Sequence, residues 1–218
     1  MTDISSNPIF NRNHMDQKYE SQISYSIEKL RTTKTTKFVY EHSFKVMQVA
    51  LYVYYLVTPT VTLSEEDLVI GSLLHDITKA RSLITKEHHA ESGYEAAKEL
   101  GCKDIICEMI RQHVDVNKTN GILTEIDIVC YADKRVKWDY IVTLKERMED
   151  IRVRYFRNAT DEMREKQNSR DAQYQLIEEE IGMLAEKNGK KEEFEQFIHL
   201  SQEGKVERFK GITEGDLL

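Results

Sequence analysis

Histidine and aspartate are the residue types whose placement in this sequence could support chemistry. Five of the seven histidines fall between residues 42 and 113. Four polar groups occupy apolar faces of segments with helical periodicity: His42, His75, His113 and Asp133. One such histidine would be an ordinary core residue, but four buried groups in one small domain carry a desolvation cost that a bound cation removes. The pattern therefore predicts a metal centre.

The dipeptide His75-Asp76 is the centre of this prediction. It follows the apolar run VIGSLL at positions 69–74, which we expect to be a buried helix that delivers the pair into the core. Adjacent helical residues point about 100° apart, so two neighbouring ligands can share one ion only at the edge of a cleft. Imidazole and carboxylate ligands together suit Mn, Fe, Co, Ni or Zn and fit Ca poorly.

Helices are expected to position these residues, because the 218 residues include only two prolines and nine glycines. Apolar residues recur at helical spacing in four segments: 21–33, 38–57, 89–100 and 103–113. Ser64 and Thr124 have the residue type and the position of N-caps for two further helices. Residues 81–87 are expected to form a loop, and strand signals are weak throughout. The predicted fold class is all-α, a helical bundle.

The chain changes character at about residue 141, beyond which charged residues dominate. An apolar stripe still recurs there at a spacing of three and four residues: Tyr174, Ile177, Ile181 and Leu184. We interpret this stripe as a packing seam, either within the chain or in a homodimer. The predicted organisation is a flexible lead-in over residues 1–20, a helical domain over residues 21–140 and a charged helical C-terminal extension over residues 141–218.

The composition limits the class of function. Hydrophobic residues make up 40% of the chain and charged residues 32%, which is typical of a folded protein. The net charge of −7 argues against a nucleic acid polymer as a partner, because proteins that bind one usually present a basic face to its phosphates. A small anionic substrate is compatible with this charge, since a bound metal reverses the local field.

Three features predict a cytoplasmic protein with no membrane partner. The N-terminal residues MTDISSNPIFNRNH lack the basic and then apolar pattern of a signal peptide. No apolar run approaches the roughly 20 residues that a membrane span requires. Cys102, Cys107 and Cys130 form no CxxC pair and are odd in number, so we interpret them as reduced thiols.

Five short motifs follow one another in a specific order: HSFKV at 42–46, LLHDITK at 73–79, HAESG at 89–93, His113, and ADK at 132–134. Their order and spacing resemble the HD superfamily of metal-dependent phosphohydrolases, and most closely its small HDIG-type members. The resemblance covers roughly residues 38–140, about half of the chain. The His-Asp dipeptide alone would carry no weight, because such pairs arise constantly by chance.

The resemblance implies a role for each matching residue. The first metal of the family would take four ligands here: His42, His75, Asp76 and Asp133. Members with two metals add histidines that match His89 and His113, and Asp76 would then bridge both ions. A hydroxide activated by the metals would be the nucleophile. Lys79, one helical turn after His75 on the same face, matches the lysine expected beside the substrate phosphate. Asp76 and Lys79 are thus the candidate catalytic residues, and the cofactor is one or two divalent transition metal ions.

The sequence departs from the family pattern at several points. Thr78 stands where the HDIG signature has glycine, and it is not expected to touch a ligand. His88 adjoins His89, and we assign the ligand to His89 because it begins the HAESG motif. Val114 stands where relatives that hydrolyse cyclic dinucleotides have a second histidine, and residues 81–87 lack the Glu-Asp pair of alarmone hydrolases. Neither of these substrate classes is therefore expected.

Basic and aromatic residues follow the last predicted ligand. Lys134, Arg135 and Lys137 either line the mouth of the site and attract phosphate, or form a solvated helix face. Trp138 is expected to pack in the core; the alternative is that its side chain covers the site.

The predicted function is hydrolysis of a phosphoester on a nucleotide or another small phosphorylated metabolite. Two alternatives stay open. Some HD relatives use six ligands and two iron ions to activate O₂, and the same six residues would serve a di-iron oxygenase. The second alternative is a non-catalytic regulatory module that binds metal and signals through the C-terminal extension. Lys79 favours a phosphate substrate over the oxygenase.

Overall fold

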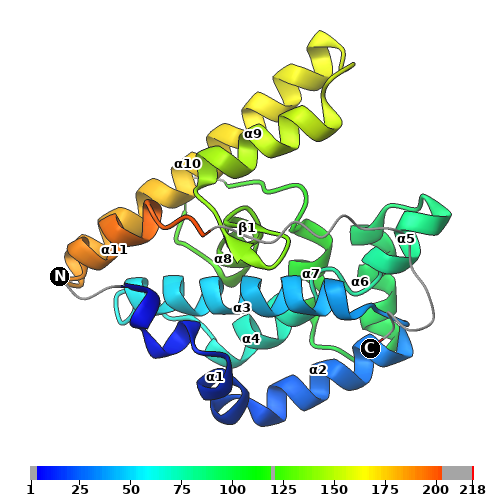
Figure 1. Cartoon of the computed structure of the whole chain (residues 1–218), viewed down its shortest axis with the longest axis horizontal. Coiled ribbons are helices and arrows are strands. Elements are labelled where there is room, and N and C mark those ends of the chain that lie inside the picture. Colours follow the sequence, from blue (N-terminus) through cyan, green and yellow to red (C-terminus); the bar gives the residue numbers. More distant parts are fainter. Residues whose placement is uncertain (1–3, 119–120, 203–217) are drawn as a thin grey trace.

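The structure, a computed structural model, describes residues 4–118, 121–202 and 218. Figure 1 shows that helices form nearly all of it. The first part of the chain forms these helices: α1 (Arg12–Lys18), α2 (Glu20–Thr32), α3 (Lys37–Val57), α4 (Glu65–Leu74), α5 (Lys79–Thr85), α6 (His89–Glu99), α7 (Asp104–Gln112) and α8 (Glu125–Asp133). After α8 come the antiparallel strands β1 (Val136–Lys137) and β2 (Tyr140–Ile141), then α9 (Leu144–Tyr155), α10 (Asp161–Lys187) and α11 (Lys191–Ile198). The predicted all-α fold is confirmed.

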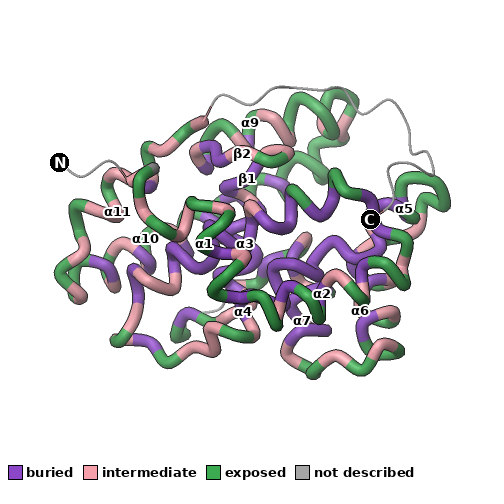
Figure 2. The backbone as a smooth tube through the Cα atoms, turned by 60° about the horizontal axis from the view of Figure 1, so that its bottom comes forward, coloured by how far each residue is buried: buried purple, intermediate pink, exposed green. Residues whose placement is uncertain are grey.

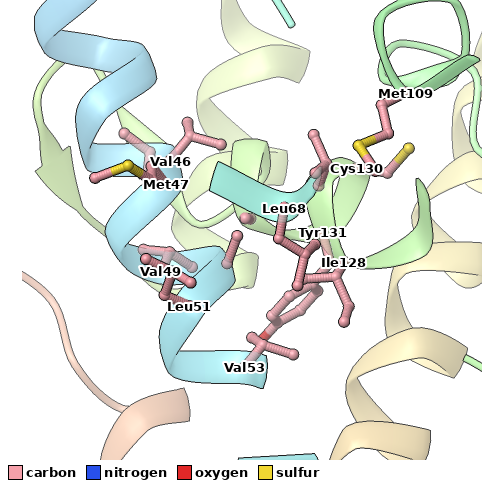
Figure 3. Close-up of a cluster of buried hydrophobic side chains, with 14 of the residues drawn as sticks. Val46, Met47, Val49, Leu51, Val53, Leu68, Met109, Ile128, Cys130 and Tyr131 are labelled. Carbon is pink, nitrogen blue, oxygen red and sulfur yellow. The ribbon is translucent and has the colours of Figure 1, made fainter. Parts of the chain in front are cut away.

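Helix α3 is the central element of the body. Thr36 caps its start, where the side-chain hydroxyl accepts a hydrogen bond from the main-chain N–H of Val39. The face predicted to be apolar is buried throughout: His42, Val46, Val49 and Val53. Helix α3 packs against α4, α8 and α10, and Figure 2 shows buried residues concentrated along α3 and α4. Figure 3 shows part of this core, where side chains of α3 lie beside Leu68 and Tyr131.

The helices that pack on α3 begin at the caps expected from the sequence. Ser64 accepts a hydrogen bond from the N–H three residues later at the start of α4, and Thr124 forms a capping box with Asp127 at the start of α8. Gly71 lets α4 approach α7 closely, because a Cβ atom at this position would lie 2.1 Å from Sδ of Met109. The caps fix where α4 and α8 begin. Helix α8 ends at the predicted ligand Asp133, and α4 ends at Leu74, immediately before the predicted ligand His75.

Residues 81–87 do not form the expected loop. Most of them belong to α5, in which neither glycine nor proline interrupts the helix. The helix ends at Lys86, whose φ of 63° is left-handed and whose N–H donates to the carbonyl oxygen of Ser82.

Residues 4–18 are folded, which corrects the expectation of a flexible lead-in. Short 3-10 helices at Ile4–Ser6 and Pro8–Phe10 precede α1. Met15 and Tyr19 are only 1% and 6% exposed, and both join the hydrophobic core. Their spacing of four residues continues to Ile23 of α2, so one apolar face runs through both helices. Residues 1–3 of the expected lead-in lie outside the described part of the chain.

The C-terminal extension leaves the body and then returns to it. Figure 1 shows α9 and the first part of α10 projecting beyond the other helices. The second half of α10 packs on α3 and α8, and it buries three residues of the predicted stripe: Tyr174, Ile177 and Ile181. Over these residues the stripe is a packing seam within the chain. A homodimer and the domain boundary at residue 141 stay predictions.

The longest described helices are α10, with 27 residues, and α3, with 21 residues. No helix in the described ranges combines the length and the apolar character that are needed to cross a membrane.

Arg135 has a structural role, which corrects both alternatives given for it, the mouth of the site and a solvated helix face. Its side chain is fully buried, and its guanidinium donates to the carbonyl oxygens of Val142 (2.8 Å) and Phe197 (2.7 Å) and to the hydroxyl of Tyr131 (2.8 Å). The carboxylate of Glu178 lies 3.7 Å away and offsets the charge. Because a guanidinium stays charged when it is buried, it requires acceptors of this kind. Arg135 thereby joins α8 to the β-hairpin and to α11.

Replacing Arg135 with alanine should lower the free energy of unfolding by about 3–5 kcal/mol, because Glu178 and several buried acceptors lose their partner. Chemical denaturation followed by far-ultraviolet circular dichroism measures this change. Arg164→Ala removes an exposed arginine from α10 and is the matched control, expected to change stability by less than about 0.5 kcal/mol. Equal stability of the two variants would contradict the role of Arg135.

Candidate metal centre

The six side chains predicted to bind metal meet at one place in the body. They come from these positions: His42 in α3, His75 and Asp76 after α4, His89 at the start of α6, His113 just after α7 and Asp133 at the end of α8. All except the first lie at a helix end or in the adjoining turn. The ends of four helices therefore converge on His42, near the N-terminal end of α3.

The turn after α4 differs from the sequence expectation. Lys79 does not continue the helix of His75, because α4 ends at Leu74 and residues 75–78 form a turn before α5. The carbonyl oxygen of Asp76 accepts a hydrogen bond from the N–H of Lys79 at 2.9 Å, which closes the turn. With the helix broken here, the side chains of His75 and Asp76 can face the same centre, and Lys79 lies beside them.

The first part of the centre is formed by His42, His75 and Asp76, whose ligand atoms lie within 4.8 Å of one another. Asp133 lies against the same group. Its Oδ1 is 3.1 Å from Nε2 of His42 and 3.8 Å from Nε2 of His75. The four residues thus offer two imidazole nitrogens and two carboxylates to one point.

The second part is formed by Asp76, His89 and His113, which also lie within the same 4.8 Å limit. Oδ1 of Asp76 is 3.2 Å from Nε2 of each histidine, and the two Nε2 atoms are 3.2 Å apart. Asp76 is common to both parts, so its two oxygens can serve two neighbouring ions.

Main-chain carbonyl groups orient three of the imidazole rings. The Nδ1 atoms lie at hydrogen-bond distance from these oxygens: Trp138 for His42 (2.6 Å), Ser72 for His75 (2.7 Å) and Ile110 for His113 (2.7 Å). With Nδ1 donating to a carbonyl group, Nε2 carries the lone pair and points to the centre. This arrangement around a metal-binding histidine is the usual one in proteins.

Two buried atoms of the centre need a partner. Within the described part of the chain, neither Nε2 of His75 nor Oδ1 of Asp76 has a hydrogen bond of acceptable geometry. An unpartnered buried polar atom is costly, and a cation at this point would satisfy both atoms. The donor set therefore fits a divalent transition metal.

Protonation states at neutral pH also fit metal binding. Burial lowers the pKa of His75 to about 4, so its ring is neutral. Burial alone would raise the pKa of Asp76, but the charge of Lys79 and the neighbouring histidines outweigh it and hold this pKa well below its usual range. For Asp133, Lys134 and His42 outweigh burial in the same way. Neutral imidazole and ionised carboxylate are the forms that bind metals.

Lys79 lies at the second part of the centre. Its Nζ is 3.2 Å from Nε2 of His89 and 3.8 Å from Oδ1 of Asp76. The side chain is 34% exposed and lines the cavity, so its ammonium group can reach a bound anion.

Thr78 contacts the main chain of a ligand, contrary to expectation. Its hydroxyl donates to the carbonyl oxygen of His89 at 2.8 Å and lies 3.0 Å from Oγ of Ser92. Gly93 lets α6 pack closely on its neighbours, because a Cβ atom there would lie 2.8 Å from Cγ2 of Ile110 and 3.4 Å from Oγ1 of Thr78. The residue in place of the signature glycine thus holds the start of α6 against the turn that carries Asp76.

The structure separates the two adjacent histidines. His89 points into the centre, whereas His88 is exposed at the N-cap of α6. Of the two, His89 therefore lies among the candidate ligands.

A cavity of about 580 Å³ opens onto the centre. Its lining includes Trp138 of the β-hairpin, Arg147 and Arg154 of α9, and Arg170 and Tyr174 of α10. No role in the site is predicted for the extension from the sequence alone. One signal was present, since Arg170 precedes Tyr174 of the apolar stripe by four residues and therefore shares its face of α10.

Comparison with known families agrees with this geometry. Residues 39–138 match the family model of the HD domain. This part of the chain is an HD domain. All six predicted ligands fall within it, and the predicted membership of the HD superfamily is confirmed. HD domains bind divalent metals and are generally metal-dependent hydrolases. Searches of curated proteins and of solved structures find no match to the chain.

The number of metal ions bound per chain should show whether each part of the centre binds an ion. We expect close to two ions per chain in the purified protein and close to one in the His89→Ala, His113→Ala double variant, because only the first part then keeps its ligands. Asp76→Ala should lose both ions while the helical content stays largely intact. Elemental analysis by mass spectrometry, with His88→Ala as the matched control, measures this. One ion in both the unaltered protein and the double variant would show that the second part binds none.

Proposed function

We propose that the protein is a metal-dependent phosphohydrolase that cleaves a phosphoester of a nucleotide or another small phosphorylated metabolite. The observation that best supports this is Lys79, whose ammonium group lies 3.8 Å from the shared ligand Asp76 and faces the cavity. A cation at this place suits a phosphate group. The finer assignment to HDIG-type proteins is part of the same proposal.

The six predicted ligands would hold one or two divalent ions, with Asp76 shared between them. When bound, the ions supply Lewis-acid activation of water and of the phosphoryl oxygens. The mixed nitrogen and oxygen donors suit Mn, Fe, Co, Ni or Zn.

The chain itself would stabilise the negative charge that develops on phosphorus. Lys79 lies beside Asp76 and His89, and Lys134 forms an ion pair with Asp133 at the same cavity. Both ammonium groups are held in place before substrate binds. Preorganised charge of this kind stabilises a transition state without further reorganisation.

The substrate that we propose is small. A net charge of −7 supports a small molecule over a nucleic acid polymer, and the cavity of about 580 Å³ lies within the usual range for small-molecule sites. A cytoplasmic location belongs to the same proposal and is supported by the three cysteines, which are all free thiols.

A di-iron oxygenase would use the same six ligands, and the positive charge of the cavity does not favour it. A regulatory module would bind metal without turnover. Screening phosphoesters with Mn-, Ni-, Co- and Fe-loaded protein, with O₂ uptake recorded for the iron form, distinguishes the three functions. We expect release of phosphate that is lost in Asp76→Asn. O₂ uptake without phosphate release would support the oxygenase, and neither signal would support the regulatory module.

Lys79→Gln should lower kcat by about 100-fold or more while metal content is kept, because a preorganised charge next to the reacting phosphate is lost. Phosphate release and metal content are measured on the same preparation. Lys86→Gln, an exposed lysine at the end of α5, is the matched control. Unchanged turnover in Lys79→Gln would remove this residue from the mechanism.

A further inference from the structure

The cavity over the metal centre has an unusual charge for an acidic protein. Apart from Asp76 and Asp133, no carboxylate lines it in the described ranges. The remaining charged lining residues, histidines aside, are all cationic: Lys79, Lys134, Arg147, Arg154 and Arg170. The net charge of the chain is −7, so the positive charge of this cavity is opposite in sign to that of the whole protein. The cavity is therefore suited to a ligand with more than one negative charge.

The five cations form two groups. Lys79 and Lys134 contact the predicted metal ligands Asp76 and Asp133. Three arginines instead come from the extension, which lies outside the HD domain match at residues 39–138. The metal centre with its two lysines can serve one phosphate group, which leaves the arginines of α9 and α10 for another.

The arginines of α9 are only partly neutralised. Asp150 is shared by Lys137 (3.0 Å), Arg147 (3.0 Å) and Arg154. Burial acts to raise the pKa of Asp150, but its bonds to Lys137 and Arg154 outweigh this effect and keep the carboxyl group ionised. One carboxylate against three cations leaves an excess of positive charge in this wall of the cavity.

Two buried polar atoms in the same wall have no partner among the described residues. They are Nε of Arg147 and the hydroxyl of Tyr174, which is only 2% exposed. Both residues line the cavity, and both groups can donate to an oxygen atom. An anion with several oxygens would satisfy donors that the protein leaves unused.

Arg170 completes the wall from α10. Its guanidinium pairs with Asp115, whose side chain is 52% exposed. Exposed ion pairs contribute little to stability, so Arg170 can exchange this partner for a ligand at small cost. Arginine presents paired N–H groups that match the oxygens of a phosphate.

We propose that α9 and α10 form a second anion-binding subsite, so that the substrate carries a further phosphate besides the one that is cleaved. The proposal rests on the phosphohydrolase function and specifies its substrate class. Arg147, Arg154 and Arg170 bind the second phosphate with the hydroxyl of Tyr174, and the metal centre with Lys79 receives the first. A substrate with one phosphate leaves these donors unpaired and binds less tightly.

The chain contains its own reporter for this subsite. Trp138 is the single tryptophan, it lines the cavity, and the guanidinium of Arg154 lies 5.2 Å from the centre of its ring. Its fluorescence can follow binding without any turnover. Inorganic phosphate and tripolyphosphate, titrated at a fixed free metal concentration, compare one phosphate with several and do not depend on the organic part of the substrate.

The experiment measures both dissociation constants in metal-loaded protein by stopped-flow fluorescence, before turnover. We expect tripolyphosphate to bind at least about tenfold more tightly than phosphate, and Arg170→Gln to reduce this ratio by about tenfold, as expected for a lost hydrogen bond to a charged group. Arg154→Gln should act in the same direction. Arg164→Gln removes an equal charge from an exposed position of α10 outside the cavity and should keep the ratio.

A ratio near one in the unaltered protein would overturn the proposal, and so would an unchanged ratio in both cavity variants. Hydrolysis of monophosphates without such a preference would leave the phosphohydrolase function standing and remove the subsite. A preference that depends on Arg170, in a protein that hydrolyses no phosphoester, would keep the subsite and reject the hydrolase.

Discussion

Two carboxylates buried among four imidazole rings set the constraint on which this structure depends. Asp76 and Asp133 are nearly inaccessible to water and yet ionised, and an ionised carboxylate inside a protein requires a cation or strong hydrogen bonds. The ends of α4, α6, α7 and α8 meet at this point, and each helix end or its adjoining turn contributes a side chain to the centre. Much of the arrangement of the HD domain is explained by the need to bring these groups together.

The β-hairpin connects this centre to the extension. On one side, the carbonyl oxygen of Trp138 orients His42 at 2.6 Å. On the other, buried Arg135 bonds to Val142 beyond the hairpin and to Phe197 of α11. A ligand of the metal centre and the packing of the C-terminal helices therefore both depend on residues 135–142, and this segment couples the extension to the centre.

The extension presents positive charge to the cavity, although the chain as a whole is acidic. Acidic residues are spread over the surface of the chain, whereas the residues of α9 and α10 that reach the cavity are arginines together with Tyr174 and neutral side chains. Low-dielectric walls strengthen the field of such a cluster. A metal centre common to a family can in this way act on a narrower set of substrates, because the second wall of its cavity comes from a segment outside the family domain.

The sequence by itself determined the fold class, most helix positions and the six candidate ligands, because helical periodicity, N-caps such as Ser64 and Thr124, and the order of the HD motifs are local properties of the chain. It did not show that α4 ends before His75, that residues 81–85 are helical, or that Met15 belongs to the core. Those outcomes depend on packing between segments that are distant in the chain. The sequence also grouped Arg135 with Lys134. In the structure Arg135 is buried and joins three segments by hydrogen bonds, whereas Lys134 lines the cavity. Only the tertiary structure decided this, since neighbouring residues on a helix point in different directions and burial depends on what packs against each of them.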